Sequence, residues 1–580
     1  MRRTIALSLI SLTFLLGCSR ADKPADKAAG GGPPVKGDWA IVRYEAEPDI
    51  LNPLLQRTAL SGYAMFGVNS SQVYEFLMGY DPQTWKLTKG LLVEGPPEIS
   101  ADHLTYTFKV RDGVKWHDGQ PFTGEDILFT FKATMCPTVD SATFRSYMTD
   151  LKEIQLEGST IRFLMTKPNV FNEFNIVNIL AIIPRHVFDS EGLLDGFSFK
   201  DIIGPKGKTD PKIKKFGEQF NRHAANRAPI GTGPYKFEKW DTGREIVLAR
   251  NDNYWGQKAY LDKIVLRVIG DYPAALTALK AGEVDLMPRL LPVQYAQQTS
   301  GPAFEEQFVR TKYSIPGYFY IGWNEDRPYF KDKRVRQALT MLLDRQTLID
   351  KVRFGLGSIG VGPLNQSSPD FNPNIKPWPY DPKRAAELLD EAGWKDHDGD
   401  GVRDKDGVKF KFEFLGGNNS TLLPQLLPIL RDEFKKAGIE MTERIVEFNV
   451  VQNSLKDHRF DASSLGWAVD LIQDPYQVWH SSSALNGGSN YVNFKNAESD
   501  RLLEQARQEF NDEKRKQIYW RWQELINDEQ PYVFLYYQEE GAAYSKRFQN
   551  VTWWPLRPGY DLISWFVPKG LQKYGTTPAP

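Results

Sequence analysis

The sequence contains little cysteine, little histidine and almost no net charge. Of its 580 residues, two are cysteines, Cys18 and Cys136, and seven are histidines. Lysine and arginine (72) nearly balance aspartate and glutamate (73). This balance argues against a strongly basic nucleic-acid surface and against a polybasic membrane patch. Two cysteines are too few for a cysteine-based metal site. From the charge balance and the cysteine count together, we expect no nucleic-acid partner and no cofactor.

Signatures of catalysis are missing as well. The chain has neither a GxSxG elbow nor an HExxH pair, and no two histidines stand at i, i+4 spacing. The segment "IIGPKGKT" ends like a phosphate-binding loop, but the first required glycine falls at Ile202. Glu539 and Glu540 are neighbours that point to opposite faces of an extended chain, which argues against a glycosidase pair. A secreted hydrolase is therefore a remote alternative, and we expect no enzyme.

One acidic run resembles a calcium-binding loop in part. "DHDGDGVRDKDG" supplies Asp396, Asp398 and Asp400 at alternate positions, with Asp404 at the ninth position of such a loop. The twelfth position, which should supply a bidentate carboxylate, is Gly407. A polar, glycine-rich connection would look the same. Calcium is therefore a weak alternative, with a structural role.

The first residues indicate a targeting segment. "MRRTIALSLISLTFLLGC" has two arginines and a short apolar run that ends at Cys18. Its end resembles the bacterial lipobox, which implies removal of residues 1–17 and a lipid on Cys18; a plain secretory signal is the alternative. Residues 18–37 then form a flexible tether. No later run is long and apolar enough to cross a membrane. We expect a body outside the cytoplasmic membrane, anchored by lipid, and periplasmic if the host is Gram-negative.

Strand and helix patterns alternate along the rest of the chain. "HLTYTFKVRDG" (103–113) and "VKFKFEFL" (408–415) alternate apolar and polar residues, which predicts half-buried strands. "KRVRQALTMLLDRQTLI" (333–349) has the period of a helix, and "YDPKRAAELLDEAGW" (380–394) is a helix with its own cap residues. Prolines and glycines at 204–215 indicate an ordered surface loop. The predicted class is mixed α/β (α+β).

Five segments, in order, carry a family resemblance. They are "LTYTFKVRDGVKWHDGQPFTGEDILFTF" (104–131), "APIGTGPYKFEKWDTGREIVLARNDNYWG" (228–256), "AALTALKAGEVDLM" (274–287), "GYFYIGWNEDRPYFKDKRVRQALTMLLDRQTLI" (317–349) and "YDPKRAAELLDEAGW" (380–394). Together they resemble the large solute-binding proteins of ABC importers, the family 5 group of peptide and nickel receptors. The resemblance covers about residues 40 to 565.

The resemblance implies a type II periplasmic binding protein, with two lobes that close on a ligand around a two-strand hinge. Its core of lobe 1 would take residues 38–78, 184–308 and 537–580, with a small extra domain at 79–183 and lobe 2 at 309–536. Such a receptor is expected to be a monomer that delivers a solute to the permease subunits of an ABC transporter.

The resemblance also implies a ligand site in lobe 2. In dipeptide and oligopeptide receptors of this family, a Trp-x-x-Asp element faces the cleft, and "GWAVDLIQDP" fits it with Trp467 and Asp470. Asp470 would pair with the ligand's α-ammonium group, because a buried charge without a partner is costly. Gly466, Trp467 and Ala468 would offer backbone groups to an extended peptide. The alternative is that Asp470 caps a helix or faces solvent and that Trp467 belongs to the core.

In lobe 1, the resemblance implies ligand contacts from the segment "SGYAMFG" (61–67). We expect it to be a loop before a helix-like stretch at 70–81, with Tyr63 and Ala64 touching the ligand. A peptide-like solute is the favoured ligand. An oligosaccharide or another organic solute is the alternative, whereas nickel is disfavoured because no histidine cluster can be argued.

Overall fold

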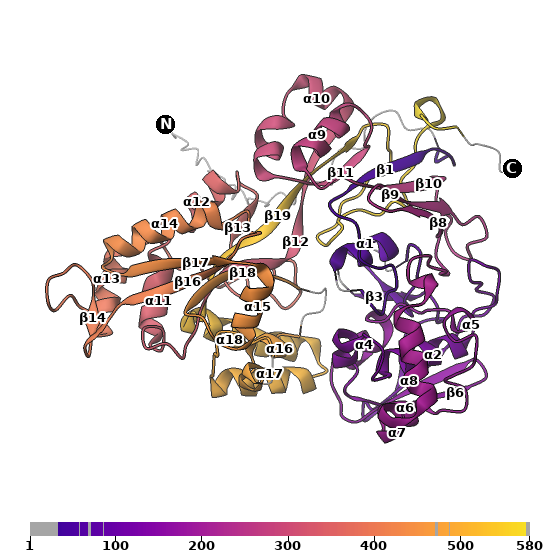
Figure 1. Ribbon diagram of the computed structural model, residues 1–580, viewed down its shortest axis with the longest axis horizontal. Helices are drawn as coiled ribbons and strands as arrows, with labels where there is room; N and C mark the ends of the chain where they lie inside the picture. Colours follow the sequence, from indigo (N-terminus) through magenta and orange to yellow (C-terminus); the bar gives the residue numbers. More distant parts are fainter. Residues whose placement is uncertain are drawn as a thin grey trace, which may run out of the picture.

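The protein consists of two lobes joined by two long strands (Figure 1). The computed structural model describes residues 33–56, 58–67, 71–84, 86–469, 474–485 and 488–575. Cys18 and Asp470 lie outside the described residues. Among the described helices, none combines the length and the hydropathy that crossing a bilayer requires.

One sheet of eleven strands runs through both lobes (Figure 1). Its path, with β13 (Gly357–Ile359) attached beside β19, is β17 (Glu440–Val446), β16 (Lys411–Gly417), β18 (Ala462–Ala468), β12 (Phe308–Trp323), β19 (Tyr532–Ser545), β11 (Leu286–Leu290), β1 (Trp39–Tyr44), β10 (Lys263–Val268), β9 (Glu245–Arg250) and β8 (Tyr235–Asp241). Strands that are distant in the sequence lie next to each other in this sheet, so the chain has to cross between the lobes.

Strands β12 and β19 form the connection between the lobes. They are 16 and 14 residues long and pair antiparallel from Phe308–Ser545 to Gly322–Tyr532. β19 pairs with β11 of lobe 1, whereas the far half of β12 pairs with β18 of lobe 2. The register shifts between Ser314 and Tyr318, and such an irregularity bends a strand. The two-strand connection that the resemblance implies is therefore present.

The small domain of lobe 1 is built on a separate four-stranded sheet. Its order is β4 (Glu98–Ile99), β5 (Thr105–Lys109), β7 (Thr160–Met165) and β6 (Leu151–Glu157). The predicted alternation in β5 is confirmed, since Tyr106 and Phe108 are buried. Helices α2 (Gly124–Met135), α3 (Ala142–Tyr147), α4 (Asn172–Asn178), α5 (Arg185–Phe188), α6 (Phe199–Ile203), α7 (Pro205–Thr209) and α8 (Pro211–Asn221) complete lobe 1's lower part in Figure 1. Helices α5 and α6 contact α2, beyond the predicted boundary at residue 183.

His117 ties the small domain to the lobe 1 core. Its Nδ1 accepts the N–H of Gly231 at 3.1 Å, and its Nε2 lies 3.0 Å from the carbonyl of Gly233. A Cβ on Gly231 would lie 1.8 Å from the carbonyl oxygen of Val73, so only glycine permits this approach. Two of the five resembling segments therefore meet at this contact, and "APIGTGPY" has a structural role.

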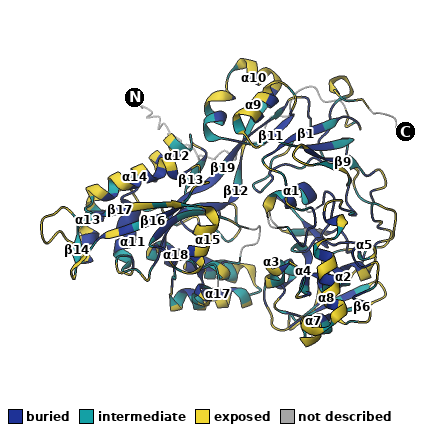
Figure 2. Ribbon diagram, viewed as in Figure 1, coloured by how far each residue is buried: buried dark blue, intermediate teal, exposed yellow. Residues whose placement is uncertain are grey.

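Lobe 2 packs helices on both faces of β17, β16 and β18. One core cluster contains Trp323, Phe330 and Phe412 with helices α11 (Lys333–Met341), α13 (Pro382–Glu391) and α14 (Leu423–Lys436). The other contains Trp479 and Trp522 with α15 (Phe448–Lys456), α16 (Tyr476–Trp479), α17 (Ala497–Gln508) and α18 (Asp512–Glu529). Figure 2 shows the buried residues concentrated on the sheet between these helices.

Several local predictions were wrong, and each error has a local cause. Residues 333–349 form two helices, α11 and α12 (Arg345–Val352), because Asp344 caps a new helix through the N–H of Thr347. The expected loop at 204–215 is helical, with Asp210 capping α8. Residues 61–67 lie mostly in helix α1 (Ala59–Phe66). The described part of 70–81 is not helical and ends in strand β2 (Met78–Tyr80).

Candidate functional site

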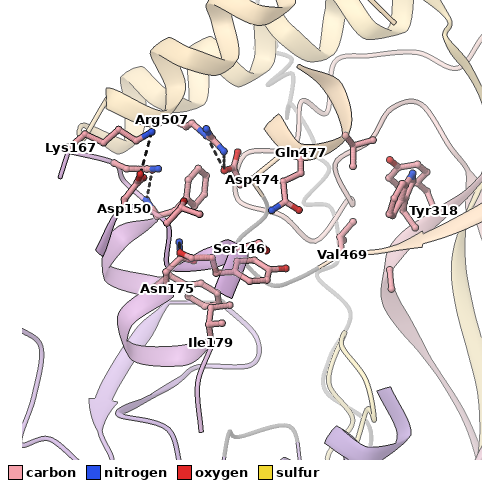
Figure 3. Close-up of a pocket in the computed structure, with 18 residues that line it drawn as sticks. Ser146, Asp150, Lys167, Asn175, Ile179, Tyr318, Val469, Asp474, Gln477 and Arg507 are labelled. Atoms are coloured by element: carbon pink, nitrogen blue, oxygen red, sulfur yellow. Dashed lines mark hydrogen bonds and ion pairs between the residues drawn. The ribbon is translucent and has the colours of Figure 1, made fainter. Parts of the chain in front are cut away.

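A cleft separates the small domain from lobe 2, and its outer part forms a cavity of about 240 Å³ (Figure 3). We call this the rim cavity. From the small domain it is lined by Asp150, Lys167 and Asn175, and from lobe 2 by Trp467, Ala468, Val469, Asp474 and Arg507, among others. Its charges are internally paired: Lys167 lies 3.3 Å from Asp150, and Arg507 lies 2.6 Å from Asp474. The rim cavity is thus polar but offers no unpaired ion from these four residues.

The lobes touch at the rim, opposite the connecting strands. The N–H of Val170 in the small domain donates to the carbonyl of Arg507 in lobe 2 at 2.9 Å. Nearby, the rings of His103 and Phe510 stack with centroids 3.6 Å apart. These contacts and the β12–β19 connection border the cleft on two sides, so a ligand in it would contact both lobes.

Strand β18 brings an unpaired backbone edge to this cleft. It pairs with β12 along its length, with Trp467 opposite Tyr318, but with β16 only at Ala462 and Ser463 among the described residues. The N–H of Val469 donates to Pro316 on the β12 side at 3.3 Å. Because backbone groups alternate in direction along an antiparallel ladder, those of Trp467 face β12.

The backbone groups of Gly466 and Ala468 therefore face the other edge, which no described strand covers. Both residues are exposed. The Trp467 side chain is half-buried and stacks on Tyr491 with centroids 5.7 Å apart. The structure thus brings three predicted site residues, Gly466, Trp467 and Ala468, to the cleft. Asp470 is the next residue but one after Ala468 and lies outside the described residues.

A second cavity, of about 440 Å³, lies where β18 approaches the connecting strands, and we call it the hinge cavity. Its walls include Phe319, Phe448 and Gly466, and its cationic lining residues in the described chain are Arg289 and Arg353. Arg353 donates to the backbone carbonyls of Leu356 and Glu539 and has no carboxylate partner among the described residues. The hinge cavity therefore has both apolar and polar walls, and Arg353 adds a positive charge that no described carboxylate balances.

Lobe 1 contributes a network of charged side chains beside the hinge cavity. Glu540 is 3% exposed, and its Oε1 lies 3.2 Å from Arg289 and 3.3 Å from Arg557. Burial lowers the pKa of Arg289, but the negative charge of Glu540 and other neighbours raises it by more. The net pKa of Arg289 is therefore above its usual value. Tyr63 lines a cavity of about 200 Å³ together with Arg289, Glu540 and Arg557. Burial raises the pKa of Tyr63. The pKa values of Arg289, Arg557 and Tyr63 are all raised, so the two arginines are cationic and the phenol is neutral at neutral pH.

The two predicted contacts in lobe 1 have different outcomes. Tyr63 is half-buried and lines cavities on the cleft side of α1. Ala64 is fully buried in the lobe 1 core, because successive residues on a helix point about 100° apart. The side chain of Ala64 therefore does not reach the cleft, and this part of the prediction is wrong.

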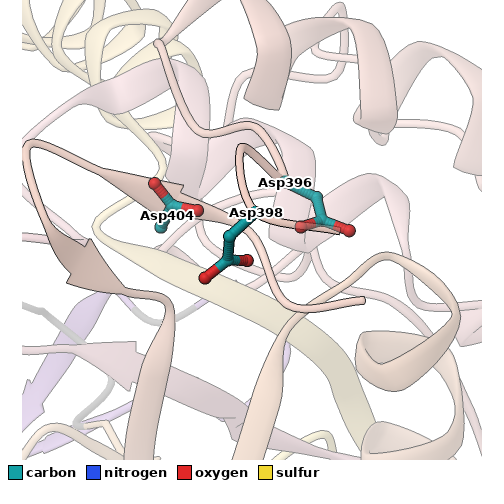
Figure 4. Close-up of side chains that lie close together, drawn as sticks. All are labelled: Asp396, Asp398 and Asp404. Atoms are coloured by element: carbon teal, nitrogen blue, oxygen red, sulfur yellow. The ribbon is translucent and has the colours of Figure 1, made fainter. Parts of the chain in front are cut away.

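The acidic run at 396–404 lies on lobe 2, at the hairpin of β14 (Asp404–Lys405) and β15 (Val408–Lys409). Asp396, Asp398 and Asp404 offer oxygens within 4.8 Å of one another (Figure 4). However, the ammonium of Lys409 lies 2.6 Å from Asp398 and 2.9 Å from Asp400. A lysine thus supplies the positive charge these carboxylates need, and calcium stays an untested prediction.

Arg289, Arg353 and Arg557 were missed by sequence reasoning. They stand in segments without a motif, and their common surroundings arise only when β11, α12 and the C-terminal segment meet at the connecting strands. Glu540 was considered only as half of an adjacent pair. Its neighbour Glu539 pairs instead with Lys312 at 2.8 Å, on the other face of β19.

Comparisons with known proteins agree with this architecture. A model described as "Bacterial extracellular solute-binding proteins, family 5 Middle" matches residues 88–489. The oligopeptide-binding protein AppA of Bacillus subtilis is 30% identical over 98% of this chain and 100% of its own length.

Solved structures show the same fold. AppA in complex with a nonapeptide has a TM-score of 0.73 at 29% identity, covering 93% of this chain and 100% of that one. NikZ of Campylobacter jejuni in complex with Ni(L-His) has a TM-score of 0.71 at 25% identity, covering 91% and 99%. These relatives are solute-binding receptors rather than enzymes, which confirms the prediction of a non-enzymatic protein with this fold. The chain belongs to family 5 of the bacterial extracellular solute-binding proteins.

Proposed function

We propose that this protein captures a peptide-like solute with a free amino terminus in the cleft between its lobes and passes it to an ABC permease. The observation that carries the proposal is the uncovered edge of β18 at the cleft. Gly466 and Ala468 direct their backbone groups to that edge. An extended peptide can pair with such an edge as an added strand, whatever its side chains.

The charges of the cleft support a ligand with two opposite ends. Asp470 follows Val469, which lines the rim cavity, and we propose that its carboxylate pairs with the ligand's ammonium group. Arg353 and Arg289 line the hinge cavity, which Ser464, Leu465 and Gly466 of β18 also line. An extended zwitterion along β18 would thus meet a carboxylate at one end and guanidinium groups at the other.

The proposal includes the protein's cellular setting. The lipobox-like segment supports cleavage before Cys18 and a lipid anchor on its sulfur, with residues 18–37 as tether. Membership of an extracellular receptor family supports a position outside the cytoplasmic membrane, as a monomer that meets its permease in the closed form. Mass spectrometry of the mature amino terminus would test the lipid directly.

Thermal unfolding with peptides tests the ligand. A ligand at 100 times its dissociation constant stabilises a protein by about 2.7 kcal/mol. We expect short peptides with free amino termini to raise the melting temperature, and their N-acetylated forms to raise it much less. Asp470→Asn should weaken binding of the free-amino peptides at least tenfold, with no loss of stability in the ligand-free protein.

The possible outcomes distinguish an error in the proposed ligand from an error in the receptor function. Equal stabilisation by free and acetylated peptides would remove Asp470 from the proposed role. Stabilisation by oligosaccharides or other organic solutes, with none by peptides, would favour the alternative ligand on the same scaffold. Turnover of a peptide or glycan by the purified protein would contradict the receptor function itself.

A further inference from the structure

A further cavity, in lobe 1, indicates which side chain a bound peptide carries, and this inference rests on the proposed function. The cavity has a volume of about 370 Å³ and lies between α1 of the core and α3 of the small domain. We call it the aromatic cavity, because five aromatic side chains line it: Tyr63, Phe66, Phe76, Tyr80 and Phe144.

The aromatic cavity adjoins the cleft on two sides. Helix α3 contributes Phe144 to it and Tyr147 to the rim cavity. Tyr63 and Arg557 line both the aromatic cavity and the cavity beside Glu540. The aromatic cavity therefore lies on the lobe 1 side, between the rim cavity and the cavity beside Glu540.

The rings of the cavity leave apolar surface uncovered. Tyr63, Phe66 and Phe144 are only half-buried, and Phe66 meets Phe76 edge to face with centroids 5.0 Å apart. Aromatic rings prefer to be covered by another ring in a stacked or edge-on arrangement. Contiguous apolar surface that stays open on a soluble protein commonly marks a binding site.

The cavity also holds a buried acceptor without a donor. The Oε1 of Gln56 is buried and has no hydrogen-bond partner among the described residues. A Cβ built on Gly62 would lie 3.0 Å from this oxygen and 3.5 Å from the Phe66 ring. The oxygen thus lies beside Gly62 of α1, in the wall of the aromatic cavity. A buried acceptor without a partner is unfavourable, so a ligand with a donor gains from meeting it.

The charge of the aromatic cavity further limits which ligand side chains it can bind. Arg557 is its ionised lining residue in the described chain, and its Nη2 donates to Glu540 at 3.3 Å. A cationic side chain would be repelled by Arg557, and an anionic one would compete with Glu540. We propose that the aromatic cavity binds an aromatic side chain of the ligand that carries a hydrogen-bond donor, a phenol or an indole, with Gln56 Oε1 as the acceptor.

Peptide titrations of the full protein test this proposal. Tetrapeptides with free amino termini, otherwise alanine, would carry Tyr, Trp, Phe, Leu or Gly at each position in turn. At one position, we expect Tyr or Trp to bind about tenfold more tightly than Phe and at least thirtyfold more tightly than Gly. A site that hydrogen-bonds a ligand group discriminates against analogues without it.

Two variants separate the ring from the donor. Gly62→Ala adds a methyl group inside the cavity and suits a helix, so it should remove the aromatic preference. Gln56→Leu should abolish only the difference between Tyr and Phe. Gly95→Ala, whose Cβ meets nothing within 4 Å, is the matched control and should change neither.

The results distinguish this proposal from the proposed function. If all peptides bind equally well, or if Gly62→Ala retains the aromatic preference, the aromatic cavity is not the subsite, while peptide capture stands. If no peptide binds, both proposals fail. A preference for Tyr that survives in Gln56→Leu would show that the donor meets another acceptor and would overturn the role of Gln56.

Discussion

The two lobes face the same cleft with different chemistry. Lobe 2 presents the backbone edge of β18, with Gly466 and Ala468 exposed. Lobe 1 presents side chains from distant segments, including Tyr63, Phe144 and Arg557. All peptides share the same main chain but differ in their side chains. Under the proposed function, lobe 2 would therefore bind the main chain of any peptide, and lobe 1 would select peptides by their side chains.

The two lobes also contain buried ionisable groups that respond to pH in opposite ways, His117 in lobe 1 and Glu325 in lobe 2. In lobe 1, His117 is held neutral: burial lowers its pKa to about 4, and its Nδ1 is occupied by the N–H of Gly231. In lobe 2, burial raises the pKa of Glu325 to about 7, and the nearby Arg336 only partly opposes this. Acid therefore acts on these two groups in opposite directions.

The largest expected effect is acid destabilisation of lobe 1 through His117. The folded-state pKa, about 4, is below the ordinary 6.5, so protonation favours the unfolded state. The contribution is fully present above pH 6.5 and is lost as the pH falls to 4, by about 3 kcal/mol at 1.36 kcal/mol per pKa unit. Urea unfolding between pH 7 and pH 4 measures it. His117→Gln, with both a donor and an acceptor, should be less stable at pH 7 but lose less on acidification; an equal loss would contradict the assignment.

Glu325 should give lobe 2 the opposite response. Its raised pKa means that the folded state prefers the protonated form, so stability is lost as the pH rises from 4.5 through 7. Glu325→Gln should stabilise the protein at pH 8 by about 2 kcal/mol, discounted because the carboxyl is partly exposed, and by much less at pH 4. Arg336 keeps a partner in Glu529 at 2.9 Å. A variant that is less stable at pH 8 would show that Glu325 is needed as an anion.

On the cleft face of lobe 2, Ala468→Pro tests the backbone edge. The N–H of Ala468 points away from β12, so its removal costs the sheet no ladder bond, and proline is tolerated at such edge positions. We expect a loss of about 2 kcal/mol in binding for every peptide that binds, because one main-chain bond is lost and the ring obstructs the edge. Isothermal titration of several peptides measures it. Losses confined to one peptide would mean that lobe 2 also selects side chains.

Sequence alone predicted elements whose signals are local. Helix α13 begins at Pro382 with Asp381 accepting the N–H of Arg384, as its cap residues indicate. The alternation at 408–415 correctly buried Phe410, Phe412 and Phe414. It failed at Val408, which is 41% exposed because it belongs to the separate β14–β15 hairpin.

The site was harder to predict, because its parts come from remote segments. Trp467 was found only through the family resemblance, since a tryptophan in this segment would equally suit a core. The segment 61–67 was expected to be a loop, whereas burial of Ala64 and Met65 against the core stabilises helix α1. Nothing local marks Arg353 as a cleft residue. Its surroundings depend on where α12 ends relative to β19.

The smallest expected effect sharpens the comparison at the point where the lobes meet. Arg353 of lobe 2 has no carboxylate partner among the described residues, so its charge is available to a ligand in the hinge cavity. Arg353→Gln should weaken binding of free-acid peptides by about 1 kcal/mol and leave C-terminal amides nearly unchanged, as for a partly exposed ion pair. Affinities for matched acid and amide peptides measure this. Arg459→Gln, which removes an exposed charge paired with Asp457, is the control. Equal losses of affinity for the acid and amide peptides would mean that the ligand's carboxylate binds elsewhere and that lobe 2 contacts only the main chain of the peptide.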